Sequence, residues 1–175
     1  LLTSILPSNV AYPLTANNVQ VEKASFWLQS QQQDDGGFEL AGSPGFETPD
    51  VIAAIASSVQ NGNTYDSSAA FSTIQSLVKS SKSPLDYVDD LVDSEFTSGT
   101  ACKLIVNVAG PLGLDPRDFD PSDDSDLPID LVSKIETSVL SDGSFGSGVL
   151  NTTLTCAIAL FVSSGKISDK TIQYI

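Results

Sequence analysis

The sequence lacks histidine and methionine altogether and has only two cysteines among its 175 residues. Histidine is the side chain best suited to proton transfer at neutral pH and is the commonest metal ligand. Its absence excludes Ser-His hydrolases, Cys-His proteases and zinc hydrolases with imidazole ligands. Because the chain begins Leu-Leu-Thr and contains no Met, we expect a segment whose signal peptide was removed or that belongs to a longer protein.

Positive charge is also scarce, since eight Lys and Arg stand against 22 Asp and Glu, which gives a net charge of −14. A surface with this balance repels phosphate backbones and anionic lipids, so we expect no nucleic-acid partner and no binding to acidic membranes. Long apolar runs are missing as well. The longest, residues 156–162, is far shorter than the ~18 residues of a membrane-spanning helix, so the sequence predicts no membrane span.

Apolar residues follow the spacing of an α-helix almost throughout the chain, and no stretch keeps the period of two that is typical of a β-strand. For example, Ala101, Leu104, Ile105 and Val108 occupy positions i, i+3, i+4 and i+7. The sequence therefore predicts an all-α fold, with a long Pro-rich and Asp-rich connection over residues 110–127. Eight helices are expected, near residues 17–31, 49–60, 67–79, 84–93, 97–109, 128–140, 151–163 and from 168 onward.

The expected helices are of two kinds. Those that start at Val51 and Leu154 are apolar nearly all round, so we expect them to be enclosed on every side. Those around Glu22 and Lys134 are amphipathic and should face water. This alternation predicts an inner layer of helices that is wrapped by an outer layer.

Two segments of the sequence match each other. Asp35-Gly36-Gly37-Phe38 follows an amphipathic helix in the first, and Asp142-Gly143-Ser144-Phe145 does so in the second. In each copy a short loop and a Thr-containing cap then lead into an apolar helix. Glycine suits such a helix end because it adopts positive φ without a Cβ clash, and the Phe can fold back over the last helical turn. Repeated αα-hairpins cannot bury their apolar faces alone, so they must stack on neighbours.

The most specific part of the repeat is Trp27-Leu28-x-x-Gln31-Gln32-x-Asp34-Asp35-Gly36-Gly37-Phe38. In these residues the chain resembles the prenyltransferase and squalene-oxidase repeat, which builds the α/α toroid of terpene cyclases, protein prenyltransferase β-subunits, complement thioester domains and cobalamin carriers. Residues 48–54 and 113–119 look like segments of exported bacterial members. The resemblance implies a partial α/α toroid of about three to four helical hairpins over residues 17–175, after an N-terminal extension over residues 1–16.

A complete toroid of this superfamily has about six hairpins, so the resemblance implies that about half a ring is present. Half a ring leaves a broad apolar edge, and exposed apolar patches larger than a few hundred Å² are rarely bare. We therefore expect either a homodimer that pairs along this edge or a C-terminal half-toroid that completes the ring.

The catalytic motifs of the enzymes in this superfamily do not occur in the sequence. A terpene cyclase needs Asp-x-Asp-Asp in a dry cavity, whereas here Asp118-Phe119-Asp120 is followed by Pro121, and residues 123–126 read Asp-Asp-Ser-Asp. A prenyltransferase needs a zinc ion held by Cys, Asp and His, and a thioester domain needs Cys-Gly-Glu-Gln. We therefore expect neither catalytic residues nor a catalytic cofactor.

Two functions remain open. We favour a non-catalytic repeat module of a secreted or cell-surface protein, which binds a protein, a glycan or a small cofactor. A cobalamin carrier is a special case implied only by the resemblance. The alternative is a fragment of a class II terpene cyclase or a protein prenyltransferase-like enzyme, whose catalytic residues lie in a part of the protein beyond this segment.

The acidic connection contains a pattern that resembles a calcium-binding loop, because oxygen ligands alternate along it. The alternating residues are Asp118, Asp120, Ser122, Asp124 and Asp126. However, Asp123 stands where such a loop has Gly, and Ile129 stands where it has Glu. We favour a solvated acidic loop and keep a weak calcium site as the alternative.

The two cysteines, Cys102 and Cys156, fall on two different predicted helices among small apolar neighbours. We favour two buried free thiols, since free Cys is among the most buried residue types. A disulfide between them is the alternative, which an acidic and Ser-rich chain of exported type makes plausible.

Three further positions invite two interpretations each. Asn151-Thr152-Thr153 fits the glycosylation sequon, but Asn151 also suits a helix N-cap, which we favour. We expect Trp27 to pack between repeats rather than to line a ligand cavity. We expect the side-chain amides of Gln31 and Gln32 to tie adjacent helix ends together rather than to bind a ligand.

Overall fold

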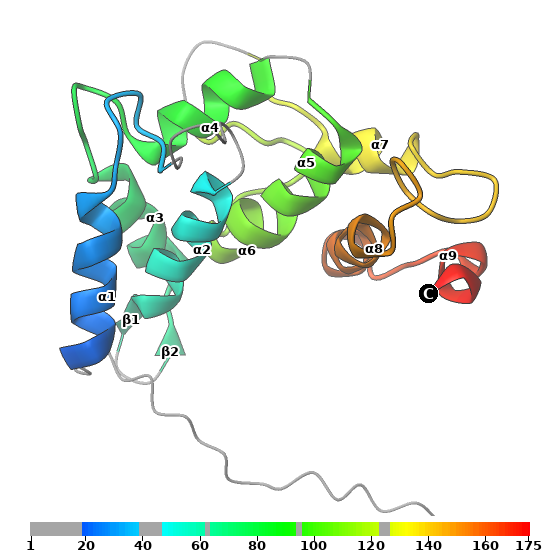
Figure 1. Ribbon diagram of the computed structural model, residues 1–175, viewed down its shortest axis with the longest axis horizontal. Coiled ribbons are helices and arrows are strands. Elements are labelled where there is room, and N and C mark those ends of the chain that lie inside the picture. The colour runs from blue at the N-terminus through cyan, green and yellow to red at the C-terminus, as the bar shows by residue number, and fades with distance from the viewer. Residues whose placement is uncertain (1–18, 39–46, 62–63, 94–95, 123–126) are drawn as a thin grey trace, which may run out of the picture.

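A computed structural model describes residues 19–38, 47–61, 64–93, 96–122 and 127–175, so the expected N-terminal extension lies outside the described residues (Figure 1). The described residues form helices and one short antiparallel hairpin, which confirms the all-α prediction. The helices are α1 (Val19–Ser30), α2 (Thr48–Ser58), α3 (Ser67–Gln75), α4 (Pro84–Asp93), α5 (Ser98–Leu104), η1 (Ile105–Ala109), α6 (Gly110–Leu112), α7 (Leu131–Glu136), α8 (Leu150–Ser164) and α9 (Asp169–Tyr174). The strands β1 (Gln60–Asn61) and β2 (Thr64–Tyr65) join α2 to α3.

The start of α4 shows how local sequence sets a helix end. Ser83 Oγ accepts a hydrogen bond from the N–H of Asp86 at 3.2 Å, and the Asp86 carboxylate accepts one from the N–H of Ser83 at 2.6 Å. This is the capping box that the spacing of Ser83 and Asp86 predicts, and Pro84 occupies the first helical position, where no N–H is needed.

The helix expected near residues 97–109 does not end at Gly110 but continues to Leu112 with a change of hydrogen-bond register. The five residues of η1 form a π-helix, in which the N–H of Gly110 donates to the carbonyl of Ile105. Pro111 has no N–H, and in an α-helix its ring would crowd the carbonyl four residues earlier. A wider turn just before the proline relieves this crowding, so the chain bulges where the sequence suggested a break.

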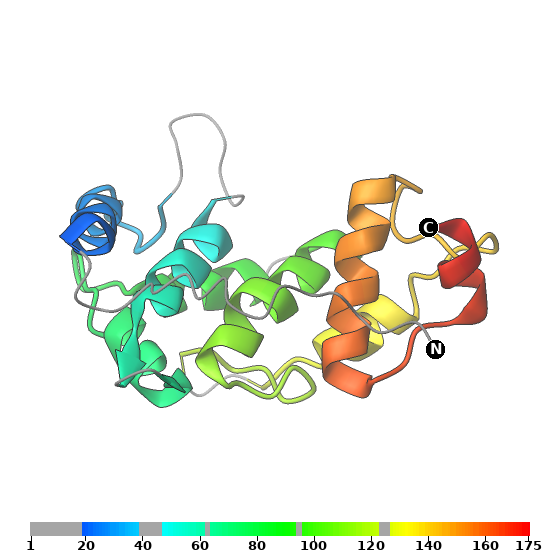
Figure 2. The ribbon, with the colours of Figure 1, turned by 90° about the horizontal axis from the view of Figure 1, so that it is seen from below.

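Three helical segments form a central row along the molecule: α2, the continuous α5–η1–α6 helix, and α8 (Figure 2). α2 packs against α1, α3 and η1, whereas α5 packs against α7 and α8. α1 lies at one end of the row and α9 at the other (Figures 1 and 2). The elements therefore follow one another in space in nearly the order of the sequence.

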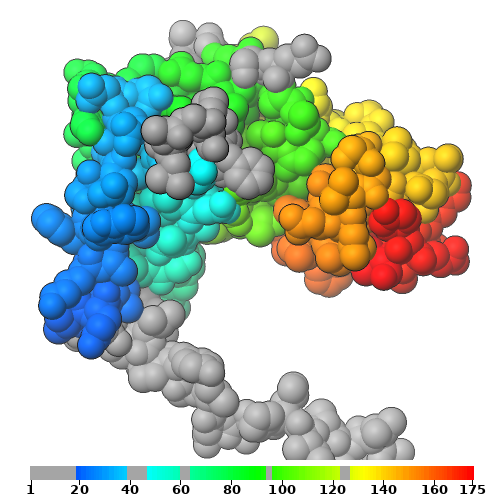
Figure 3. All heavy atoms as spheres, viewed as in Figure 1, coloured from blue at the N-terminus to red at the C-terminus, as the bar shows by residue number. Residues whose placement is uncertain are grey.

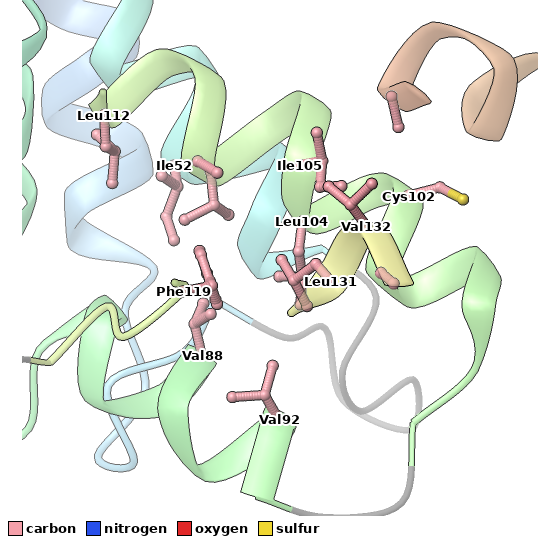
Figure 4. Packing of buried hydrophobic residues seen from close by; sticks show 14 of the residues in the cluster. Ile52, Val88, Val92, Cys102, Leu104, Ile105, Leu112, Phe119, Leu131 and Val132 are labelled. Atoms are coloured by element: carbon pink, nitrogen blue, oxygen red, sulfur yellow. The ribbon is translucent and has the colours of Figure 1, made fainter. Parts of the chain in front are cut away.

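The hydrophobic core lies between the central row and the helices that flank it. Ile52 from α2, Val88 from α4, Leu104 from α5 and Leu131 from α7 converge around Phe119, and all five are buried (Figure 4). Burying one such side chain stabilises the fold by about 1.5–3 kcal/mol. Phe119 lies in the Pro-rich connection, which therefore contributes to the core instead of only linking helices.

A disulfide joins Cys102 in α5 to Cys156 in α8, with the two Cα atoms 4.8 Å apart. Both cysteines are fully buried, as the sequence suggested. The favoured interpretation as free thiols is nevertheless wrong, because the two helices pack with these positions face to face. The bond covalently fixes two neighbouring members of the central row.

The expectation that α8 is enclosed on every side is also wrong. Leu150, Leu154, Ile158 and Phe161, which we call the α8 face, are between 38% and 59% exposed. α8 packs against α5, η1 and α7, whereas in the described part of the chain nothing buries this opposite side. An apolar helix is enclosed only if other elements pack on all its sides, and the apolar pattern of the sequence does not show whether they do.

Two single-residue expectations also fail. Trp27 does not pack between repeats, since it is 60% exposed on α1, a helix with no buried residue. Asn151 is not an N-cap: α8 begins at Leu150 after Val149, so Asn151 lies inside the first turn, and its side chain lines a surface pocket.

Candidate functional site

The two Asp-Gly-x-Phe segments form corners of the same geometry. Gly36 and Gly143 both have φ of +91°, and an aspartate oxygen (Asp35 Oδ1 or Asp142 Oδ1) accepts the N–H two residues later at 3.0 Å in both. The phenylalanine that follows, Phe38 or Phe145, is buried in both corners. The expected internal repeat is therefore present in the local structure.

Each corner is tied to the start of a helix in the central row through a threonine. The N–H of Phe38 donates to Thr48 Oγ1 at 2.9 Å, and the N–H of Phe145 donates to Thr153 Oγ1 at 3.2 Å. Both threonines are fully buried. The sequence suggested that Thr48 caps its own helix. Thr48 is instead the first residue of α2, and its side chain holds the preceding corner. The two corners in this way fix the N-terminal ends of α2 and α8.

Each corner also abuts the start of a later helix. A Cβ atom at Gly36 would lie 2.2 Å from the carbonyl oxygen of Ser83, just before α4, and one at Gly143 would lie 2.4 Å from the carbonyl of Lys170 in α9. Thr171 Oγ1 donates to the carbonyl of Gly143 at 2.9 Å. Only a residue without a side chain fits such a position, so both glycines serve as joints between successive helices.

The polar side chains of the corners stabilise the turns. The Gln32 side chain donates to the carbonyls of Gly36 and Leu77 at 3.1 and 3.0 Å, so it ties adjacent helix ends as expected. Among the described contacts, the Gln31 side chain donates only to its neighbour Ser30. In the second corner, hydrogen bonds from the Ser144 side chain and backbone lower the pKa of the Asp142 carboxyl below its ordinary value. A hydrogen bond to the ionised form favours that form.

A pocket of about 510 Å³ opens where the fixed ends of α2 and α8 meet the start of α5. Its volume lies in the range of pockets that hold small molecules or short segments of larger ones. Six of the twelve lining residues carry hydroxyl or amide side chains, and Val106 and Ile158 contribute to the apolar part of the lining. The lining residues are Pro49, Asp50, Thr97, Gly99, Thr100, Lys103, Val106, Asn107, Asn151, Thr152, Thr155 and Ile158.

The charged groups of the pocket are paired with one another. Asp50 accepts from Lys103 Nζ at 2.8 Å through one carboxylate oxygen and from Asn107 Nδ2 at 2.6 Å through the other. The Lys103 side chain is only 16% exposed, so its ammonium group is fixed in the wall. The pocket therefore offers fixed hydrogen-bonding groups with no net charge, an environment suited to a neutral polar ligand.

The π-helix contributes directly to this pocket. Val106 and Asn107 both belong to η1, and both line the pocket. π-bulges are frequent at functional sites because the extra residue changes which side chains a helix presents. The bulge that accommodates Pro111 thus lies in the same segment that brings the Asn107 amide to Asp50.

The calcium hypothesis concerns residues of which only part is described. Asp118 is exposed and Asp120 is half-buried, whereas Asp124 and Asp126 lie outside the described residues. Within the described ranges no group of three His, Cys, Asp or Glu side chains is placed to hold a metal ion. Ser122, also in the pattern, donates to Asp89 Oδ2 at 2.8 Å.

Sequence reasoning did not identify the pocket. One signal was present, since Asn107 interrupts the apolar run Leu104–Ala109, and a polar residue within such a run needs a polar partner in the folded chain. From the sequence, Asp50 lies only in the first turn of the helix expected near residues 49–60. Which three helices converge depends on tertiary packing, which helical periodicity does not specify.

Comparison of the chain with protein-family models, with curated proteins and with solved structures finds no match. No helix within the described ranges combines the length and apolarity needed to cross a membrane.

Proposed function

We propose that the chain is a non-catalytic repeat module, with inner and outer helices arranged as part of an α/α toroid, and that it binds its ligand in the pocket between α2, α5 and α8. The observation that carries the proposal is the convergence of three helix starts on one pocket whose position the two corners fix. The ligand is a glycan, a protein segment or a small neutral cofactor such as a corrinoid.

The state of the pocket's ionisable groups supports binding over catalysis. General acid–base chemistry needs a group that exchanges a proton with the substrate. Asp50, which provides the one carboxylate among the described lining residues, accepts two hydrogen bonds from within the wall. Lys103 is engaged by the same carboxylate. Neither group is placed as a free acid or base.

The disulfide supports a location outside the reducing cytosol. Disulfides form and persist in oxidising compartments and are rare in cytosolic proteins. Because Cys102 and Cys156 are bonded and buried in the centre of the fold, the bond is structural. We accordingly place the module in a secreted or cell-surface protein.

The proposal is tested by binding measurements on matched tryptophan variants. Thr155→Trp adds a large side chain to the pocket wall, whereas Gln75→Trp adds the same side chain to an exposed position of α3 away from the pocket. Wild type and both variants are titrated with cyanocobalamin by calorimetry and applied to a glycan array. We expect a ligand that Gln75→Trp retains and Thr155→Trp binds at least tenfold more weakly.

Two results would contradict the proposal. A ligand bound equally well by Thr155→Trp and Gln75→Trp would place the binding site elsewhere on the molecule. Turnover of squalene or of polyprenyl diphosphates by the protein would replace the binding module with the enzyme alternative.

A further inference from the structure

The α8 face is an apolar surface on the side of α8 that points away from the disulfide. Leu154 and Ile158 lie two residues before and two residues after Cys156, so helix geometry places them about 160° from the bond to α5. Leu150 and Phe161 extend the same side along the helix. α8 and α9 together form one end of the molecule (Figures 2 and 3).

The apolar surface exposed there is comparable to the largest patch on a typical monomer, and such patches are often functional. Besides the α8 face, Val149 and Val162 at its margins are 53% and 62% exposed. With roughly 150–200 Å² for each fully exposed apolar side chain, these six residues present on the order of 500 Å². Two copies of this surface would bury on the order of 1,000 Å² together, which is the lower limit for a specific protein–protein interface.

The charge distribution favours contact at this end over contact through the acidic middle of the chain. Residues 127–175 carry four Asp or Glu and three Lys, a net charge of −1, whereas residues 34–126 carry a net charge of −13 and residues 1–33 are neutral. Residues 149–165 carry no charge at all. Two chains of charge −14 repel each other, and the repulsion is smallest where the nearly neutral ends face each other.

We propose that two copies of this chain pair through the α8 face across a two-fold axis, α8 against α8. A two-fold interface uses the same patch on both subunits, so this uncharged apolar surface serves both partners. This inference does not rest on the proposed function, because the binding pocket is within one chain. Ile158 lies at the border of the pocket and the α8 face, so the second copy would lie beside the pocket opening.

The test is the mass of the full chain in solution, measured by sedimentation equilibrium between about 1 and 200 µM at near-neutral pH and moderate salt. Wild type is expected at twice the chain mass of 18.3 kDa at the upper concentrations. Leu154→Glu and Phe161→Glu each place two charges in the two-fold interface. Each is expected to weaken dimerisation at least about 100-fold.

Phe26→Glu is the matched control, since Phe26 is an equally large exposed apolar residue at the α1 end, 74% exposed. It is expected to dimerise like wild type. Circular dichroism of all variants verifies that the fold is kept. A wild-type monomer at 200 µM would overturn the proposal, as would a dimer that Leu154→Glu and Phe161→Glu leave intact. A dimer that only Phe26→Glu dissociates would assign the interface to α1 instead.

Discussion

Replacing the corner glycines with alanine tests whether the two Asp-Gly-x-Phe segments are joints between helices. At φ of +91° an L-residue is strained, at a cost of about 1–2 kcal/mol. The new Cβ would also lie 2.2 Å from a carbonyl oxygen at Gly36 and 2.4 Å from a carbonyl at Gly143, both backbone atoms that do not yield easily. Forcing such a neighbour aside costs about 1–3 kcal/mol more.

We therefore expect Gly36→Ala and Gly143→Ala to lower the free energy of unfolding by about 2–5 kcal/mol each. With an m-value of about 2 kcal/mol/M, the urea midpoint falls by roughly 1–2.5 M, which circular dichroism at 222 nm measures. Gly165→Ala is the matched control, because φ there is +69° and nothing lies within 4 Å of the added Cβ. It should cost only the backbone strain of about 1–2 kcal/mol. If both corner variants were no less stable than Gly165→Ala, the close packing of the corners would be refuted.

Three further predictions concern the same framework. Replacing both Cys102 and Cys156 with alanine opens a loop of 54 residues and should destabilise the protein by about 4 kcal/mol in urea denaturation. If reduction of the wild-type protein left the urea midpoint unchanged, the bond would be absent. Thr153→Val keeps the shape but leaves the buried N–H of Phe145 without an acceptor, so it should cost about 1–3 kcal/mol, whereas a neutral effect would exclude the bond. Asp142→Asn tests the charge in the second corner. Because the pKa of Asp142 in the folded state lies below 3.8, the ionised carboxylate stabilises the fold above pH 3.8. This contribution is lost as the pH falls through the folded-state pKa. The variant should be less stable than wild type at pH 6, with a gap that closes towards pH 2 in urea titrations; a gap that does not depend on pH would contradict this.

The helices were predictable from the sequence because each depends on a local pattern. The stripe of Ala101, Leu104, Ile105 and Val108 occurs on the buried side of α5 and η1, and the Ser83–Asp86 pair closes the capping box of α4. Such signals act within a few residues, so the helices that they specify depend little on distant parts of the chain. The shared geometry of the corners was predictable for the same reason.

The errors arose where the outcome depends on partners far away in the sequence. Among the described residues, none buries Trp27 or the α8 face, and the pairing of Cys102 with Cys156 depends on how α5 meets α8. The pocket depends both on local sequence and on packing between distant segments. The polar residues Asp50 and Asn107 were visible in the sequence, but their meeting depends on a π-bulge and on the packing of three helices.

Hydrogen exchange of two amides tests most directly the central claim, that equivalent corners hold the ends of the central row and so position the pocket. The N–H groups of Phe38 and Phe145 donate to the buried side chains of Thr48 and Thr153, although both lie in loop segments. Measured by NMR under native conditions, both amides should exchange at least about 1,000-fold more slowly than unprotected amides, because they open only with a large part of the fold. If either amide exchanged as fast as an exposed loop residue, the two corners would not be the paired joints described here.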